Sequence, residues 1–194
     1  MKITFVIGGA RSGKSSFVLN MASNLEGTMA YIATGEALDE EMRDRISKHR
    51  EDRGPEWSTY EEPVEIAEVL SEIKDSYSAV VVDCLTLWLS NVLHRTQDTK
   101  VRRKRSEYRT QTTEDYIQEF IDKLKSLKDS SPVTRHSLQL FIVSNELGMG
   151  IVPENAMARE FRDLTGFLNQ KVAAAADEVY LVTAGIPLKI KGSI

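Results

Sequence analysis

The sequence predicts an α/β fold in which a mostly parallel central sheet is flanked by helices. Short, continuous apolar runs of strand length alternate with longer segments of helical periodicity along the chain. Continuous apolar runs, as opposed to alternating ones, are typical of parallel strands that are covered on both faces. The chain has 194 residues without an internal repeat or a linker-like stretch, so we expect one domain over residues 1–194.

The first quarter of the chain contains two predicted strands and two predicted helices. Lys2–Gly8 is an apolar run that ends in glycines, and the helix that follows is expected over Lys14–Asn24. Met29–Ala33 is a second short apolar run and is predicted to be a strand. Asp39–Arg53 is polar and helix-forming, and Asp39 suits the N-cap position of a helix.

The middle of the chain is predicted to be helix, strand and helix. Val64–Lys74 has apolar residues at helical spacing, Ala79–Val82 reads as a buried strand, and Leu85–Leu93 continues as an apolar segment that favours helix. The stretch from about Arg95 to Thr113 is basic and almost free of apolar residues. We expect it to be a mobile loop or an exposed helix end, and we interpret residues 95–113 as a basic insertion.

The last third of the chain completes the alternation. Tyr116–Leu127 returns to a helical pattern, Leu138–Val143 is a fourth strand, Ala156–Ala175 is a long helix, and Glu178–Ala184 is a fifth strand. Strands joined through helices imply right-handed crossovers between parallel neighbours.

Composition excludes several classes of protein. The formal net charge of -4 argues against a protein that mainly coats nucleic acid, because such domains usually carry a basic surplus. The single cysteine, Cys84, cannot form an internal disulfide, which fits a reducing cytoplasm. No run approaches the roughly 20 apolar residues that a membrane-spanning helix needs. We therefore expect a cytoplasmic protein with no membrane span.

A phosphate-binding motif follows the first predicted strand. It matches the pattern G-x-x-x-x-G-K-[ST] and consists of Gly8, Gly9, Ala10, Arg11, Ser12, Gly13, Lys14 and Ser15. In such a P-loop the backbone N–H groups and the N-terminus of the next helix bind phosphates. Lys14 is expected to reach the β and γ phosphates of ATP or GTP, and the Ser15 hydroxyl to bind Mg²⁺. The motif makes the expected fold P-loop NTPase-like.

Asp83 is the candidate for the second group directed at Mg²⁺. It ends the apolar run Val80–Val82, and the carboxyl ends of parallel strands meet at one edge of a sheet. Asp83 should therefore lie near the P-loop, where nucleotide-hydrolysing and phosphotransferring enzymes place such an acid.

His49 is the candidate nucleophile. Helical spacing puts Met42, Ile46, His49 and Arg53 on one side of the predicted helix. Arg50 and Arg53 flank the imidazole with cations that suit phosphate oxygens and favour its neutral, nucleophilic form. From spacing alone, a solvated histidine on a polar helix remains the alternative.

Many ordered segments of the chain resemble those of the bifunctional adenosylcobinamide kinase / adenosylcobinamide-phosphate guanylyltransferase family of cobalamin biosynthesis. In addition to the P-loop they are Tyr31–Thr34, Glu41–Met42, Arg45–Ile46, His49–Arg50, Trp57, Glu61–Pro63, Val82–Asn91, Ser144–Glu146, Gly150–Pro153, Arg159, Phe161–Asp163, Asn169–Gln170 and Ala184–Leu188. The resemblance covers nearly the whole chain. One departure is Gly54, which stands where many relatives have proline.

The resemblance implies two reactions. In the first, ATP or GTP phosphorylates adenosylcobinamide; in the second, GMP passes from GTP through a GMP-histidine at His49 to adenosylcobinamide phosphate. The resemblance also implies a homotrimer, and it assigns further nucleotide contacts. Those contacts are Ala33, Thr34, Gly35, Arg50, Glu51, Asp52, Arg53, Glu61 and Asp83.

Three other functions remain open from the sequence. A different small-molecule P-loop kinase would use Lys14 and Asp83 but would leave His49 unexplained. A GTP switch is disfavoured, because the chain lacks N-K-x-D and D-x-x-G segments. A nucleic-acid arm at residues 95–113 would bind in a salt-dependent way, whereas a solvated insertion would not.

Overall fold

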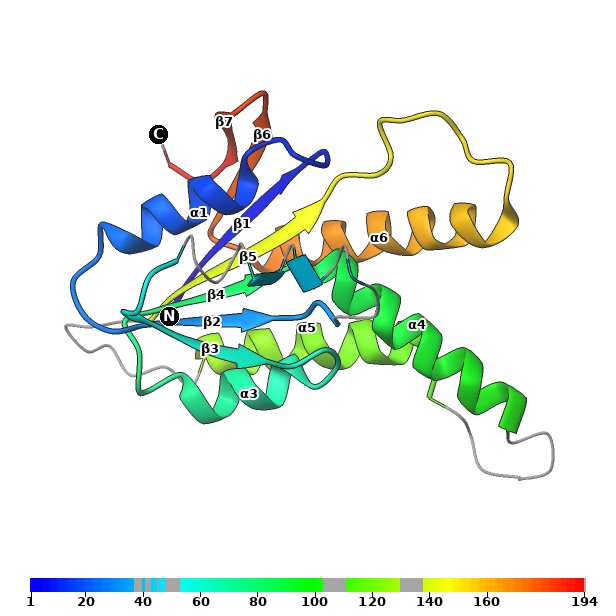
Figure 1. Cartoon of the computed structure of the whole chain (residues 1–194), viewed down its shortest axis with the longest axis horizontal. Helices are drawn as coiled ribbons and strands as arrows, with labels where there is room; N and C mark the ends of the chain where they lie inside the picture. Colours follow the sequence, from blue (N-terminus) through cyan, green and yellow to red (C-terminus); the bar gives the residue numbers. More distant parts are fainter. Residues whose placement is uncertain are drawn as a thin grey trace.

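The computed structural model describes residues 1–36, 40, 43–44, 46–47, 53–102, 111–129 and 138–193. Helices and strands alternate along most of the chain, except that α5 follows α4 and β7 follows β6 (Figure 1). The elements are β1 Lys2–Gly8, α1 Lys14–Ser23, β2 Met29–Ala33, β3 Trp57–Glu61, α3 Ile66–Ile73, β4 Ala79–Asp83, α4 Leu85–Arg102, α5 Thr113–Asp129, β5 Gln139–Asn145, α6 Ala156–Ala175, β6 Glu178–Thr183 and β7 Ile186–Lys191.

The seven strands form one sheet in the order β3-β2-β4-β5-β1-β6-β7. Every neighbouring pair is parallel except β6 and β7, which are antiparallel. The α/β fold and the mostly parallel sheet are therefore confirmed. The prediction missed the two edge strands, β3 and β7.

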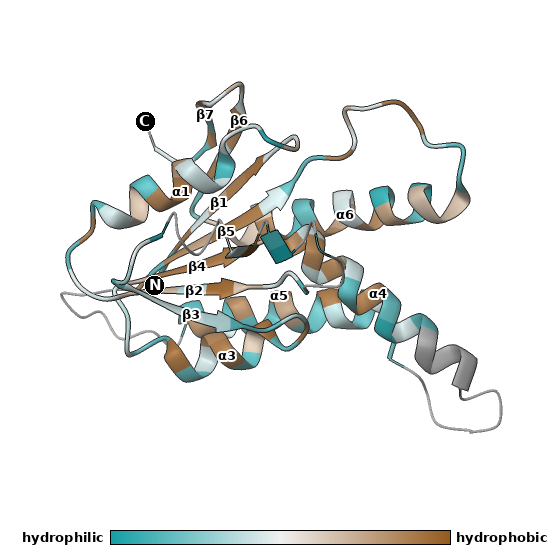
Figure 2. Ribbon diagram, viewed as in Figure 1, coloured by the Kyte–Doolittle hydropathy of each residue, from teal (hydrophilic) through white to brown (hydrophobic). Residues whose placement is uncertain are grey.

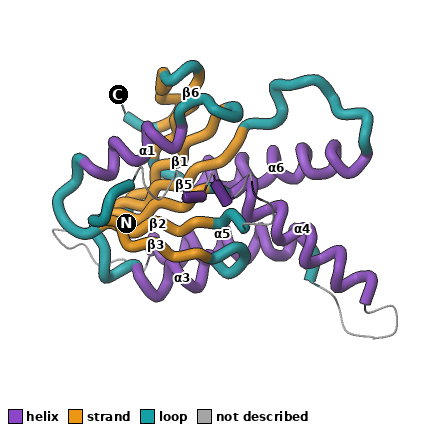
Figure 3. The backbone as a smooth tube through the Cα atoms, viewed as in Figure 1, coloured by secondary structure: helices purple, strands orange, loops and turns teal. Residues whose placement is uncertain are grey.

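The two faces of the sheet carry separate apolar clusters. On one face α1 packs against the sheet through Val18 and Ala22, together with Val81 of β4 and Val143 of β5. The other face is covered by α3, α4, α5 and α6, whose buried side chains include Trp88 and Phe120. Figure 3 shows the sheet between these helix layers, and Figure 2 shows that apolar residues concentrate on the central strands.

The direction of the strands determines which residues meet at the carboxyl end of the sheet. Gly8, Ala33, Glu61, Asp83 and Asn145 end β1, β2, β3, β4 and β5. Ala33 is in register with both Glu61 and Asp83, and Gly8 is in register with Asn145. All of these residues except Asn145 are predicted site residues. The fold therefore brings them together at the carboxyl end of the parallel strands.

The basic stretch after Leu93 is more regular than a loop. Helix α4 continues through it as far as Arg102, and α5 begins at Thr113. Thr96 is buried, and its hydroxyl lies 3.1 Å from that of Thr113, which joins the two helices. Of the predicted stretch 95–113, residues 103–110 lie outside the described residues; Arg95 is exposed and Thr96 is buried, and the helix is longer than the predicted Leu85–Leu93.

Within the predicted helix Asp39–Arg53, the five described residues before Arg53 are helical. Arg53 itself lies in a turn. In the part of the chain that the structure describes, no helix is long and apolar enough to cross a membrane.

Candidate nucleotide-binding site

The P-loop connects β1 to α1 in the predicted strand–loop–helix arrangement. Gly13 precedes α1 with a φ of 95°, a left-handed conformation that favours glycine. A Cβ at Gly8 would overlap the carbonyl oxygen of Val182 on β6, so no larger residue fits where the loop leaves the sheet. Glycine is therefore required at both positions for the loop to curl over the sheet edge.

The loop is held from two sides by backbone hydrogen bonds. Glu146 N donates to the carbonyl of Gly8 at 2.9 Å, and Gly185 N donates to the carbonyl of Ser12 at 2.9 Å. No described side chain caps the N-terminus of α1, and its first turn carries no acidic residue. Helix N–H groups that lack a cap are the groups that bind phosphate in this kind of loop.

Lys14 lies inside the loop and is only 7% exposed. Its Nζ donates to the carbonyl of Gly9 at 2.6 Å and is 3.5 Å from Ser12 Oγ. A buried ammonium surrounded by loop atoms is placed to bind an anion that enters the loop.

Asp83 lies at the P-loop, as the sequence predicts, and it contacts Ser15 directly. Ser15 Oγ donates to Asp83 Oδ2 at 2.7 Å. Among the described residues no group of three or more His, Cys, Asp or Glu side chains could hold a metal ion. A hydroxyl with a single carboxylate fits Mg²⁺, which takes oxygen ligands and usually completes its shell with water and substrate phosphates.

Asp83 has a second partner that the sequence did not identify. Tyr31 OH donates to the same carboxylate oxygen, Asp83 Oδ2, at 2.9 Å. Burial, and then the charge and hydrogen bond of Asp83, raise the pKa of Tyr31 well above its ordinary value, so this phenol stays protonated. A tyrosine in a buried strand is normally core, which is why the pattern gave no signal.

Arg53 lies beside Tyr31, on the α1 side of the sheet. Its guanidinium carbon is 3.8 Å from the centroid of the Tyr31 ring, and its Nη2 is 3.5 Å from Thr59 Oγ1. The side chain is 6% exposed, and its Nε has no partner in the described part of the chain. The predicted site residues His49, Arg50, Glu51 and Asp52 lie outside the described residues.

Thr34 and Gly35, also predicted to contact nucleotide, follow β2. Thr34 is fully buried and its hydroxyl bonds to both the carbonyl and the N–H of Cys84 at 2.8 Å, while Asn91 Nδ2 donates to its carbonyl at 2.8 Å. In this structure Thr34 therefore fixes the ends of β2 and β4. Gly35 leaves room for Leu87, whose Cδ1 would lie 3.3 Å from an added Cβ.

A second group of polar residues supports the loop from β5. Thr86 Oγ1 accepts from Asn145 N at 2.8 Å, and Asn169 Nδ2 donates to the carbonyl of Asn145 at 3.0 Å. These contacts hold the end of β5 beside Gly8. Sequence reasoning assigned no site role to Thr86, Asn145 or Asn169, because the three are far apart along the chain.

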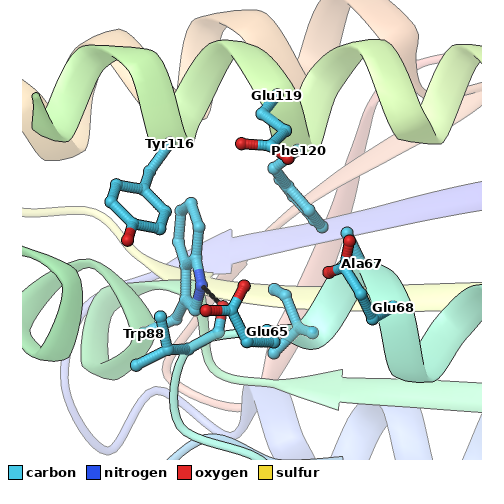
Figure 4. A pocket seen from close by; sticks show the side chains of 9 residues that line it. Glu65, Ala67, Glu68, Trp88, Tyr116, Glu119 and Phe120 are labelled. Carbon is cyan, nitrogen blue, oxygen red and sulfur yellow. Dashed lines mark hydrogen bonds between the residues drawn. The ribbon is translucent and has the colours of Figure 1, made fainter. Parts of the chain in front are cut away.

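A small cavity lies on the opposite face, between α3, α4 and α5 (Figure 4). Its walls include Glu65, Trp88, Tyr116 and Phe120, and Trp88 Nε1 donates to the carbonyl of Val64 at 2.7 Å. With a volume of about 20 Å³ it has room for roughly one water molecule, so it is not a nucleotide site.

Cys84, next to Asp83, is predicted to be inert in the folded protein. Burial raises the pKa of its thiol to about 11, so at pH 8 the reactive thiolate is scarce. A disulfide reagent such as dithionitrobenzoate should modify the native chain at least about tenfold more slowly than the chain in denaturant. Equal rates in the two states would contradict the buried placement of Cys84.

The fold and the loop define a P-loop nucleotide-binding protein. Among solved structures, the chain resembles an ATPase of the type III secretion system of pathogenic bacteria, with a TM-score of 0.53 and 9% identity. It also resembles the assembled ATPase EscN of enteropathogenic E. coli, with a TM-score of 0.55 and 10% identity. The alignments cover 97% and 94% of this chain but only 56% and 43% of those chains. At such identities they show the fold alone.

The sequence profile described as "Cobinamide kinase / cobinamide phosphate guanyltransferase" matches residues 4–190, and the chain belongs to this family. It is 38% identical over 186 residues to the bifunctional adenosylcobalamin biosynthesis protein CobU of Escherichia coli strain K12, covering 96% of this chain and 98% of that protein. It is 33% identical over 187 residues to the bifunctional adenosylcobalamin biosynthesis protein CobP of Pseudomonas aeruginosa, covering 96% of each.

Proposed function

We propose that this chain catalyses both reactions of cobinamide activation. It phosphorylates adenosylcobinamide with ATP or GTP, and it then transfers GMP from GTP through a GMP-histidine to adenosylcobinamide phosphate, giving adenosylcobinamide-GDP. Family membership over residues 4–190 supports this function. The observation that carries the kinase reaction is the buried Lys14 inside a P-loop whose Ser15 is hydrogen-bonded to Asp83. Family membership supports the guanylyl transfer.

In the kinase reaction the hydroxyl of the substrate's aminopropanol arm attacks the γ-phosphorus, and the nucleoside diphosphate leaves. Lys14 and the N–H groups of the loop bind the phosphates and stabilise the charge on the transferring group. Ser15 and Asp83 are the residues that would hold Mg²⁺, which neutralises phosphate charge when bound. Ala33, Gly35, Glu61 and Arg53 are proposed as further nucleotide contacts at the same edge.

In the second reaction a nitrogen of His49 attacks the α-phosphorus of GTP, and pyrophosphate leaves. A phosphate oxygen of adenosylcobinamide phosphate then attacks the phosphorus of the GMP-histidine, which restores the free imidazole. The covalent intermediate divides one difficult displacement into two steps. The cations of Arg50 and Arg53 are proposed to hold the triphosphate, with Glu51 and Asp52 in the same segment.

A double-label experiment tests the proposed function. The chain is incubated with α-labelled or γ-labelled GTP, with and without adenosylcobinamide. The γ label should pass to the corrinoid, whereas the α label should first appear on the protein and then on the corrinoid. Transfer of the γ label without any α label on protein or corrinoid would favour the alternative, a small-molecule kinase without guanylyltransferase activity.

We also propose that the chain assembles as a homotrimer, as the resemblance implies. Apolar side chains on two surfaces support an assembly. On β7, Ile186, Leu188 and Ile190 are between 53% and 68% exposed, and in the loop after β5, Ile151 is 96% exposed. Apolar groups gathered in this way on a surface often mark contacts between proteins.

Leu188→Glu should weaken the assembly. Burying a leucine contributes about 1.5–3 kcal/mol, so a charge in its place should raise the dissociation constant at least about tenfold. Light scattering after size-exclusion chromatography should show a trimer for the wild-type chain and smaller species for the variant. Ser126→Glu, on the exposed side of α5, is the control for added charge. A monomeric wild-type chain would refute the assembly.

A further inference from the structure

Tyr31 connects two parts of the proposed site that are far apart in the sequence. It lies on β2 in register with Val81 of β4, two residues before Asp83. Val81 and Tyr31 both belong to the apolar cluster on the α1 face, so side chains at positions 81 and 83 point to the same side as the tyrosine. The phenol reaches diagonally across to Asp83 and is only 3% exposed.

The hydroxyl of Tyr31 acts on the carboxylate that faces the P-loop. Tyr31 OH and Ser15 Oγ donate to the same atom, Asp83 Oδ2, at 2.9 and 2.7 Å. Two donors on one oxygen fix the rotation of the carboxyl group. Partners that hydrogen-bond a metal-directed carboxylate in this way orient it, and their loss typically weakens metal affinity.

The ring of Tyr31 acts on a different residue. The guanidinium of Arg53 stacks on it with its central carbon 3.8 Å from the ring centroid, and Trp57 packs edge-on against the same ring with centroids 6.3 Å apart. Arg53 is buried, and its Nε has no partner among the described residues. Among the described residues, the ring and the hydroxyl of Thr59 contact this cation. Arg53 is also the first described residue after positions 48–52.

We propose that Tyr31 is a positioning residue with two separable tasks: its hydroxyl orients Asp83 for Mg²⁺, and its ring supports Arg53, which follows His49 by four positions in the sequence. This inference rests on the proposed function of the site. It gives Tyr31 a part in both the kinase and the guanylyl transfer reactions. It also predicts that loss of the hydroxyl and loss of the ring have different effects.

Tyr31→Phe separates the tasks, because it removes the hydroxyl and keeps the ring. We expect about a tenfold rise in the Mg²⁺ concentration that gives half-maximal binding of a fluorescent, non-hydrolysable GTP analogue. Binding is measured without turnover, so the readout is independent of activity. Tyr77→Phe is the matched control, since it removes a hydroxyl that bonds to Tyr60 at 2.9 Å, away from the P-loop, and it should leave the Mg²⁺ dependence unchanged.

Tyr31→Leu removes the ring as well as the hydroxyl. At saturating Mg²⁺ we expect this variant to be labelled by α-labelled GTP at least about tenfold more slowly than Tyr31→Phe. The reason is that the desolvated cation–π contact between the ring and Arg53 is lost. Thermal unfolding of each variant shows whether the chain is folded. If Tyr31→Leu does not fold, the Mg²⁺ titration of Tyr31→Phe still tests the role of the hydroxyl. Arg53→Leu then tests the premise of the second task, because fast labelling by this variant would leave the ring no functional cation to support.

Two kinds of failure can be told apart. If the wild-type chain binds the analogue without any dependence on Mg²⁺, or takes no α label, the proposed function fails. If the wild-type chain behaves as proposed but Tyr31→Phe titrates like Tyr77→Phe, the hydroxyl does not position Asp83. If Tyr31→Leu, when folded, or otherwise Arg53→Leu, labels as fast as Tyr31→Phe, the support of Arg53 by the ring is wrong.

Discussion

Lys14→Ala is expected to lower the rate of phosphoryl transfer to adenosylcobinamide by at least about 10²-fold, the loss typical of removing one group that stabilises transition-state charge. The Nζ of Lys14 lies within the loop, 2.6 Å from the carbonyl of Gly9, and its side chain is buried. Solvent therefore cannot easily replace the lost cation beside the phosphates. Transfer of γ label to the corrinoid, measured at saturating nucleotide, gives the rate.

Two further variants make the result specific. Lys14→Met keeps most of the aliphatic stem and should lose activity to the same extent, which separates charge from packing. Lys125→Ala, on the exposed surface of α5 and 3.8 Å from Asp122, removes a lysine remote from the loop and should retain wild-type turnover. Near wild-type transfer by Lys14→Ala would mean that the loop does not bind the transferred phosphate.

The central part of the fold was predictable because its signal is local. The strands β1, β2, β4 and β5 are buried on both faces, and each appears in the sequence as a continuous apolar run. The edge strands have a weaker signal. Trp57–Glu61 has one buried residue, and Ile186–Lys191 contains Pro187 and has no buried residue, as is typical of an edge strand.

The helix that begins at Leu85 was predicted too short for a related reason. After Leu93 its apolar pattern ends, and the buried Thr96 places its hydroxyl 3.1 Å from that of Thr113. The periodicity of apolar residues cannot indicate a helix that continues through polar positions. The contact of Thr96 with α5 exists only in the folded chain, so the apolar pattern of the sequence gives no sign of it.

The residues of the site were predictable only where their signal is local in the sequence. A P-loop is contiguous, so its lysine and serine can be recognised from the sequence, and Asp83 follows from where strands end. The contacts of Tyr31 with Asp83 and Arg53 join three separate segments, and no spacing rule connects them. Such contacts arise from the order of β3, β2 and β4 in the sheet, which the sequence pattern alone does not specify.

His49 carries the prediction that distinguishes a bifunctional enzyme from a simple kinase. α-labelled GTP should label the wild-type chain through a phosphoramidate bond, which acid breaks and alkali tolerates. His49→Ala should take no label, because no other group supplies the attacking nitrogen. His94→Ala, which removes an exposed histidine of α4, is the matched control and should label like the wild-type chain.

His49→Ala should keep at least part of the kinase activity. Transfer of the γ-phosphoryl group depends on positioning and on charge stabilisation by Lys14 and its neighbours, and it requires no imidazole nucleophile. Loss of α labelling together with retained γ transfer is therefore the expected signature, and Lys14→Ala should not reproduce it, because that variant loses γ transfer. Label that persists in His49→Ala, or that maps to His94 or His136 in the wild-type chain, would overturn the assignment and leave the guanylyltransferase reaction without a nucleophile.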